Sequence, residues 1–310
     1  MSEKRVISID STILNTFQMC ARKAQYNFEE NLQPPIKAEP LERGDLLHKM
    51  MELYYGLTWA REGEQWVISD DNDTIVKLVE ANMLSSNVED FSDWAKRVKF
   101  AVEAGRYFST KMELGIDEVE ETIFQFGEYA KHFRYDTWRP LAVEEVGSKK
   151  IHEDEETIIV YNFKIDLIME KDGMVIPWDH KTSRRAQSPS SLSNQFIGYA
   201  FGIGASHVIV NKIGFQKTKK PSERFLRDLL TYDAERIEEW LANTIWWTQM
   251  YDHHKSTNEW PMNLTSCDKY SGCIYSSLCE QAPSGREWVK QRQYIVGRAW
   301  DVASILEANK

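Results

Sequence analysis

The dipeptide Asp172-Gly173 lies between two runs of apolar and β-branched residues and sets a tight turn in this chain. Asp-Gly in that setting is the strongest short-range signal for a two-residue β-hairpin. In such a hairpin Lys171 pairs with Met174. Counting outward in the same register places Asp166 opposite Asp179. The sequence therefore predicts an antiparallel hairpin in which two carboxylates face each other.

These facing carboxylates require a compensating cation. Directly opposed side chains share one face of a hairpin, with Cβ atoms about 4.5–5.5 Å apart. Lys181 follows Asp179 by two residues and so emerges on the same face. Like charges at that distance repel, and one carboxylate takes up a proton unless a cation lies between them. A divalent metal ion between Asp166 and Asp179, beside Lys181, resolves the conflict. An ordinary solvated hairpin face is the alternative interpretation.

Composition limits the class of protein. Of the 310 residues, 42% are hydrophobic and 28% charged, as in soluble globular domains. No stretch approaches the roughly 20 apolar residues of a membrane helix, and the N-terminus lacks the apolar core of a signal peptide. We therefore expect a cytoplasmic protein with no membrane partner. The net charge of −10 argues against indiscriminate coating of nucleic acid, but it does not exclude a DNA enzyme with a local basic channel.

Apolar periodicity predicts an α/β fold with a mixed sheet. Helices are expected over residues 11–30, 43–55, 73–115, 191–204 and 233–256, and from about 284 to the end. Strands are expected over residues 143–151, 157–170, 174–181 and 206–215, the first three as an antiparallel meander. Asp10 or Ser11 is the expected N-cap of the first helix, and Gly204 ends the fourth. A meander followed by a helix and a strand gives a mixed sheet flanked by helices.

The predicted helix at 191–204 carries a polar pair. Gln195 and Tyr199 are four residues apart, so both project from one helical face. Packing of Tyr199 against neighbouring phenylalanines is the alternative. Together with Asp166 and Asp179-x-Lys181, the pair Gln195-x-x-x-Tyr199 resembles the PD-(D/E)xK nuclease superfamily, and within it the RecB-like group. The signature proline is displaced to Pro177.

The resemblance extends upstream and implies a function. Residues 43–48 read R-G-D-L-L-H, similar to the G-x-x-x-H motif that carries an extra metal-ligand histidine, here His48. The family implies a restriction-endonuclease-like fold: a mixed β-sheet core flanked by helices, with a helical insertion and cysteine-clamped termini. It also implies a metal-dependent DNA exonuclease, acting on single strands or DNA ends in recombination, repair or phage DNA metabolism. A recombination or replication protein as partner, and an oligomer, are compatible with that role.

The family also implies roles for individual residues. His48, Asp166, Asp179 and the backbone carbonyl of His180 would hold Mg²⁺ or Mn²⁺, for which oxygen and imidazole ligands are suited. Lys181 would orient the attacking water and stabilise the charge that develops on phosphorus. Gln195 and Tyr199 would position the motif or the DNA strand. Strand alternation sends Glu144 and Glu145 to opposite faces, so at most one of them joins the metal, and the sequence does not decide which.

One domain over residues 1–310 is expected. Its parts are an N-terminal helix with a cluster cysteine (1–35), a helical region (41–135), the PD-(D/E)xK core (140–216), and C-terminal helices with further cysteines (225–310).

All four cysteines lie near the two ends of the chain. Cys267, Cys273 and Cys279 are spaced C-x5-C-x5-C, and Cys20 stands alone near the N-terminus. Three clustered thiols leave a tetrahedral site one ligand short, and Cys20 can supply the fourth. Four thiolates suit zinc or an iron–sulfur cluster. The alternative interpretation is that the four cysteines are buried free thiols that bind no metal.

This split arrangement resembles AddB-type nucleases and CRISPR-adaptation exonucleases, which implies a [4Fe-4S] cluster clamping the chain ends. The sequence around Cys20, S-T-I-L-N-T-F-Q-M-C-A-R-K, is similar to their N-terminal pattern. Their C-terminal trio is more often C-x2-C-x5-C, and the wider first gap here keeps zinc as an alternative.

Basic residues suggest where DNA binds. The densest basic run comprises Lys212, Lys217, Lys219, Lys220, Arg224 and Arg227. Arg184 and Arg185 directly follow the strand that carries Lys181. Lysine and arginine at these positions would neutralise phosphates, although a charge run is often only a solvated face. A non-catalytic DNA-binding adaptor on the same fold is the rival function, which the presence of both aspartates and Lys181 disfavours.

Overall fold

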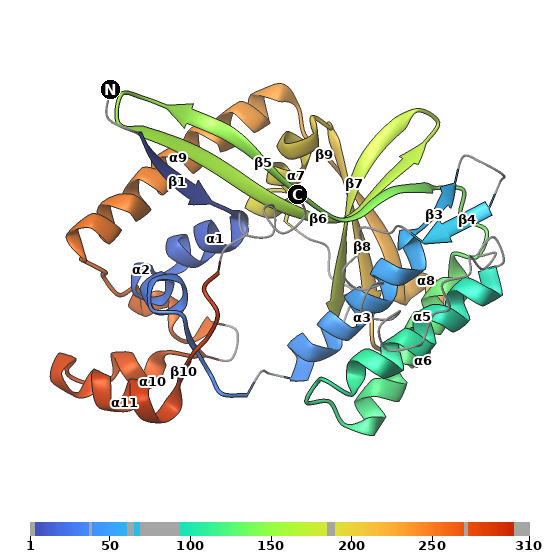
Figure 1. The fold of residues 1–310 in the computed structure, drawn as a ribbon, viewed down its shortest axis with the longest axis horizontal. Coiled ribbons are helices and arrows are strands. Elements are labelled where there is room, and N and C mark those ends of the chain that lie inside the picture. The colour runs from blue at the N-terminus through green and yellow to red at the C-terminus, as the bar shows by residue number, and fades with distance from the viewer. Residues whose placement is uncertain are drawn as a thin grey trace.

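A six-stranded mixed β-sheet forms the centre of the computed structural model (Figure 1). The structure describes residues 4–36, 39–60, 65–68, 94–184, 190–269 and 272–300. The strand order is β1-β6-β7-β8-β9, and β5 pairs with β6 beside that path. The sheet strands are β1 (Arg5–Ile9), β5 (Arg139–Glu153), β6 (Thr157–Lys171), β7 (Met174–Ser183), β8 (His207–Gly214) and β9 (Phe225–Thr231). Pairing is parallel for β1 with β6 and for β7 with β8, and antiparallel elsewhere. The predicted mixed sheet core is confirmed.

The β6–β7 hairpin has the register expected from its turn. Its rungs run from Lys171–Met174 outward to Leu167–Trp178. Asp172 and Gly173 have φ values of 53° and 79°, the left-handed pair that a type I′ turn needs. Asp166 and Asp179 are the next positions outward, just beyond the last paired rung.

Helices cover the sheet and enclose two main cores. The first core joins α3 (Glu39–Gly56), α5 (Trp94–Ser109) and α6 (Ile116–His132) to strands β6, β7, β8 and β9. The second joins α1 (Ser11–Met19), α7 (Asn194–Ile203) and α9 (Ala234–Thr257) to β1, β6 and β8. Figure 1 shows α3, α5 and α6 grouped together, away from α1 and α9. No helix among the described residues is long and apolar enough to cross a membrane.

The long strand β6 changes core at Asp166. Residues Ile159, Tyr161, Phe163 and Ile165 pack into the second core, whereas Leu167 and Met169 pack into the first. Strict alternation would keep all these odd-numbered residues on one face, so the strand twists at this point. Asp166 therefore lies where the two cores meet, a position that sequence periodicity does not reveal.

The predicted helix over 11–30 is wrong at Cys20. Cys20 is extended, with φ −166° and ψ 118°. It separates α1 from α2 (Ala21–Ala24) and the following π-helix Gln25–Glu29. The expected N-cap is confirmed, because the Asp10 carboxylate accepts from the N–H groups of Thr12 (2.7 Å) and Ile13 (2.9 Å). The break leaves the thiol of Cys20 at a joint between helices.

Strands account for the other differences from the predicted elements. Strands β1 and β9 were not expected, since each is short and lacks clean alternation. Residues 57–68, within the expected helical region, contain the hairpin β3 (Leu57–Ala60) with β4 (Gln65–Ile68). Among the described residues, which end at 300, the expected C-terminal helix is limited to α11 (Arg286–Gln293), after which β10 (Ile295–Val296) pairs with β2 (Leu32–Gln33). Gly204 ends α7 as expected, with φ 71°. Residues 69–93, part of the expected insertion, lie outside the described residues. The remaining short helices are Pro221–Arg224, Leu264–Ser266, Ser276–Cys279 and Pro283–Gly285.

Candidate metal centre and catalytic lysine

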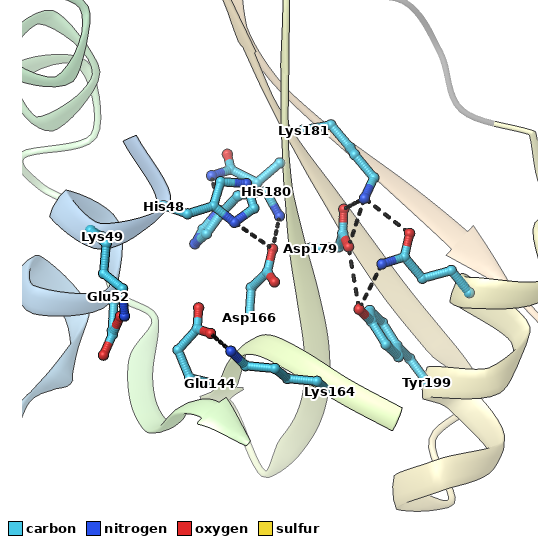
Figure 2. Close-up of polar contacts among 12 residues, drawn as sticks. His48, Lys49, Glu52, Glu144, Lys164, Asp166, Asp179, His180, Lys181 and Tyr199 are labelled. Atoms are coloured by element: carbon cyan, nitrogen blue, oxygen red, sulfur yellow. Dashed lines mark hydrogen bonds and ion pairs between the residues drawn. The ribbon is translucent and has the colours of Figure 1, made fainter. Parts of the chain in front are cut away.

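Three elements bring together a group of metal-ligand side chains. His48 of α3, Glu144 of β5 and Asp166 of β6 each offer one ligand atom, and these atoms lie within 4.8 Å of one another. His48 Nδ1 is 3.6 Å from Asp166 Oδ2. Figure 2 shows the three side chains pointing toward one another. The structure thus joins the predicted ligands His48 and Asp166 and adds Glu144.

Local packing holds His48 against the sheet. Leu46, Leu47, Met50 and Met51 of α3 are fully buried in the first core, so the helix has one fixed face. A Cβ at Gly44 would lie 3.2 Å from Thr182 Oγ1, which shows how closely α3 approaches the end of β7. A larger residue at Gly44 would require the Thr182 side chain or α3 to shift by a few tenths of an ångström.

Glu144 has an unusual backbone for a strand residue. Its φ of 51° lies in the left-handed region, which costs a non-glycine residue energy and is found most often at functional sites. Its carboxylate pairs with Lys164 of β6. Of Glu144 and Glu145, between which the sequence left the choice open, it is Glu144 whose carboxylate lies within 4.8 Å of the ligand atoms of His48 and Asp166.

Asp166 is the most perturbed carboxyl of the centre. It accepts the N–H of His180 at 2.7 Å. Burial and then the negative charge of Asp179 raise the pKa of Asp166 to about 7, while His48 opposes the shift. Burial lowers the pKa of His180 well below its ordinary value, so that imidazole is neutral. In the metal-free protein the centre therefore holds an excess of negative charge that favours either a proton or a cation.

Asp179 and Lys181 lie in a second polar set, on the side of α7. Asp179 is fully buried, and its Oδ2 is 2.8 Å from Lys181 Nζ. Lys181 also donates to Gln195 Oε1 at 2.9 Å. Gln195 in turn donates to the Tyr199 hydroxyl at 2.8 Å, which lies 3.5 Å from Asp179 Oδ1. The expected helical pair thus closes a ring of contacts around the lysine (Figure 2).

Asp179 stays outside the three-residue ligand group. The two aspartates still interact, since the charge of Asp179 raises the pKa of Asp166. The sequence expectation of one ion directly between the two carboxylates differs from this arrangement. The reason is the twist of β6 at Asp166, which turns its carboxylate toward α3 while Asp179 faces α7.

A buried polar network behind the centre escaped the sequence reasoning. Asn211 of β8 donates to the Tyr129 hydroxyl at 2.9 Å and lies 2.8 Å from His180 Nδ1. The hydroxyls of Tyr55 and Tyr129 are 2.9 Å apart. Arg227 donates to the Tyr129 hydroxyl at 3.4 Å. The available signal was an asparagine within an otherwise apolar strand, since a buried amide needs hydrogen-bond partners.

Half of the dense basic run serves the fold. Lys212 is buried and pairs with Asp228 at 2.6 Å. Arg224 is buried and donates to Gln125. Arg227 lies over the rings of Phe133 and Trp178. These three residues therefore make structural contacts, and they are not among the expected DNA contacts Lys217, Lys219 and Lys220.

The other basic residues lie at the surface or cannot be placed. Lys217 is 3.5 Å from Glu121, and Lys219 is 3.3 Å from Glu223. Lys220 and Arg184 are exposed. Arg185 lies outside the described residues.

The four cysteines come together from the two chain ends. The Asn263 N–H points at Cys20 Sγ, 3.3 Å away, and the Cys273 N–H donates to the Cys267 carbonyl at 2.8 Å. Burial raises the pKa of Cys267, followed by the charges of Cys273 and Cys20. Burial likewise raises the pKa of Cys279, again with Cys20 and Cys273 as neighbours. All four thiols are free and half-buried.

Comparisons with known proteins bear on this geometry. The family model described as "PD-(D/E)XK nuclease superfamily" matches residues 11–280. No curated protein matches the sequence significantly. Among solved structures, a crystal structure of SSO0001 shares 17% sequence identity, with a TM-score of 0.32, over 67% of this chain and 94% of that one.

Proposed function

Because this chain belongs to the PD-(D/E)XK nuclease superfamily, we propose that it is a divalent-metal-dependent DNA exonuclease. Membership of the family supports a nuclease acting on DNA; action on single strands or DNA ends is our finer assignment. The observation that carries the proposal is the proximity of the His48–Glu144–Asp166 group to the Lys181–Asp179 pair. A metal-ligand group beside a paired lysine is the arrangement needed for hydrolysis of a phosphodiester.

The donor set fits Mg²⁺ or Mn²⁺. Two carboxylates and an imidazole are suitable ligands for these cations. We propose His48, Glu144 and Asp166 as side-chain ligands, with Asp179 and the His180 carbonyl completing the shell. When bound, such a cation polarises the scissile phosphate and lowers the pKa of the attacking water.

The protein's own groups supply orientation and charge. Lys181 pairs with Asp179 on the α7 side of the centre, and its ammonium would stabilise the negative charge that develops on the phosphate oxygens. Gln195 and Tyr199 hold Lys181 and Asp179 in place through the contacts at 2.9, 2.8 and 3.5 Å. Fixing the lysine in advance reduces the reorganisation needed at the moment of reaction.

We propose that Cys20, Cys267, Cys273 and Cys279 hold a [4Fe-4S] cluster. Zn–S bonds of about 2.3 Å would place sulfurs about 3.8 Å apart around a tetrahedral zinc ion. Among the described residues, which include all four cysteines, no three thiol sulfurs lie within 4.8 Å of one another. The choice of a cluster rests on the resemblance to iron–sulfur nucleases, and a single zinc ion is the alternative.

The surroundings of the site suggest how DNA reaches it. Arg184 and Arg185 directly follow strand β7, which carries Lys181, and Lys217, Lys219 and Lys220 follow the neighbouring strand β8. We propose these residues as phosphate contacts. We further propose a role in recombination, repair or phage DNA metabolism, with a recombination or replication protein as partner.

End-labelled single- and double-stranded DNA tests the proposal. The wild-type protein is expected to degrade DNA progressively from ends with Mg²⁺ or Mn²⁺, and not in EDTA. Lys181→Ala should lower the rate by at least about 10²-fold, the scale of lost transition-state charge stabilisation, with unchanged thermal unfolding. Lys99→Ala, at an exposed lysine of α5 paired with Glu103, serves as a surface control. A wild-type protein that binds DNA without cutting it would identify the chain as a non-catalytic adaptor.

A further inference from the structure

We propose that Lys164 acts as a charge placeholder: it holds Glu144 in the metal-free protein and is released to a DNA phosphate when a divalent cation binds. This inference rests on the metal centre of the proposed function. Lys164 belongs to neither the family motifs nor the ring of contacts around Lys181. It is, however, the cation that the structure places against a member of the ligand group.

The contacts of Lys164 locate it at the edge of the centre. Its ammonium pairs with the Glu144 carboxylate, and it interacts electrostatically with Asp166 and Glu52. Figure 2 shows its side chain extending from β6 to Glu144. Its side chain keeps 42% of its surface exposed. A lysine anchored at one carboxylate and open to solvent can turn away without unpacking a core.

The charge balance explains why the lysine is there. Glu144 and Asp166 offer oxygens to the same group of mutually close atoms, so without a cation they repel each other. Lys164 offsets part of that charge. A divalent ion at His48, Glu144 and Asp166 would bring two positive charges beside the ammonium, and the repulsion would weaken the Lys164–Glu144 pair. The released ammonium would then lie beside the metal, where a phosphate of the substrate must sit.

The neighbouring pair Lys49–Glu52 provides a matched control. Lys49 Nζ is 2.6 Å from Glu52 Oε2, and the Lys49 side chain is 39% exposed, close to the value for Lys164. Glu52 is nearly buried but does not belong to the ligand group. Removal of Lys49 therefore deletes a positive charge from the same neighbourhood without freeing a ligand carboxylate.

Titration of the DNA-free protein with Mn²⁺, followed by calorimetry, tests the placeholder role. Lys164→Met is expected to tighten Mn²⁺ binding on the order of tenfold, because a competing positive charge is removed. Lys49→Met should change the affinity less than about twofold. In a Glu144→Gln background the tightening by Lys164→Met should be clearly smaller, since only the interaction of Lys164 with Asp166 is left. Unchanged or weaker Mn²⁺ binding by Lys164→Met, or equal tightening by Lys49→Met, overturns the placeholder role.

Steady-state kinetics at saturating Mn²⁺ test the second part. Lys164→Met is expected to raise the KM for a short single-stranded oligonucleotide about fivefold, with kcat within about twofold, because one phosphate contact is lost. An unchanged KM overturns the phosphate contact. A wild-type protein that binds no Mn²⁺ or cuts no DNA would instead refute the proposed function, so the two failures are distinguishable.

Discussion

Asp166 carries the electrostatic conflict of the candidate centre on a single side chain. It is partly shielded from water, it lies near the charge of Asp179, and it accepts one backbone hydrogen bond from His180. The first two effects favour the protonated acid and the third favours the carboxylate. Since the pKa of Asp166 is raised to about 7, protons and metal ions compete for it near neutral pH.

This competition predicts a pH-dependent metal effect. A carboxyl whose folded pKa is raised above its unfolded value of 3.8 contributes stability that is lost as pH rises through the folded pKa. The metal-free protein is therefore expected to lose stability as pH rises from about 4 to about 7, with the last part of the loss between pH 6 and 8. A divalent cation replaces the proton, so the rise in Tm on adding Mg²⁺ should be larger at pH 8 than at pH 6.

Differential scanning calorimetry at both pH values, with and without Mg²⁺, measures this difference. Asp166→Asn keeps the shape of the side chain and removes the titration, so its Tm should respond little to Mg²⁺ at either pH. An equal Mg²⁺-induced shift of the wild-type Tm at pH 6 and pH 8 would contradict the assignment of Asp166 as a ligand.

At the scale of elements, strand β5 supplies a ligand through a strained backbone. Glu144 has φ 51°, between partners Val143 and Glu145 that keep their rungs with β6. Glycine adopts this conformation without strain. The strand thus gives up stability at one position, where the carboxylate joins His48 and Asp166.

This strain predicts that glycine and alanine at position 144 differ in their effect on stability but not in their effect on metal binding. The free energy of unfolding of Glu144→Gly should exceed that of Glu144→Ala by about 1 kcal/mol. Both variants lose the carboxylate, but only glycine adopts the positive φ without strain. Both variants should lose Mn²⁺ affinity to a similar extent. Urea unfolding and calorimetric titration measure the two quantities. If Glu144→Ala proved as stable as Glu144→Gly, the strain would have no energetic weight.

At the scale of the whole molecule, the two chain ends are joined. The Trp300 indole donates to Asp10 Oδ2 at 2.7 Å, β10 pairs with β2, and Cys20 lies by the C-terminal cysteines. Asp10 caps α1, which packs into the second core together with α7. The closure therefore supports the helix that holds Gln195 and Tyr199.

Loss of a thiol of the proposed cluster is expected to loosen this closure. The wild-type protein should contain about four iron atoms per chain, whereas Cys20→Ser should contain none and purify colourless. The Tm of Cys20→Ser should be several degrees lower, because the folded protein is no longer stabilised by binding the cluster. Trp300→Phe removes only the hydrogen bond to Asp10 and should keep iron and colour. Iron analysis, visible spectra and calorimetry on anaerobically purified protein measure these outcomes. A colourless wild-type protein containing zinc would show that the metal is zinc.

Local patterns were sufficient for much of the sheet. The Asp172-Gly173 turn predicts the hairpin register because a two-residue turn fixes every rung outward from it. Alternation located β5 to β8, and Asp10 and Gly204 marked helix ends through their own backbone preferences. Patterns failed where pairing is long-range: β1 is held by parallel pairing with β6, and β10 by β2. Short strands of that kind carry no periodic signal of their own.

The sequence by itself determined which functional side chains are present and how they are spaced. These are two aspartates and a lysine at hairpin spacing, a glutamine–tyrosine pair on one helical face, and four thiols near the two ends. Only the tertiary structure decided how these are divided. The twist of β6 at Asp166 puts His48 and Glu144 on one side and Asp179 and Lys181 on the other, and it brings Lys164 to the edge. A twist accumulates over many packed residues on both faces of a sheet, so no local pattern encodes where it turns a side chain.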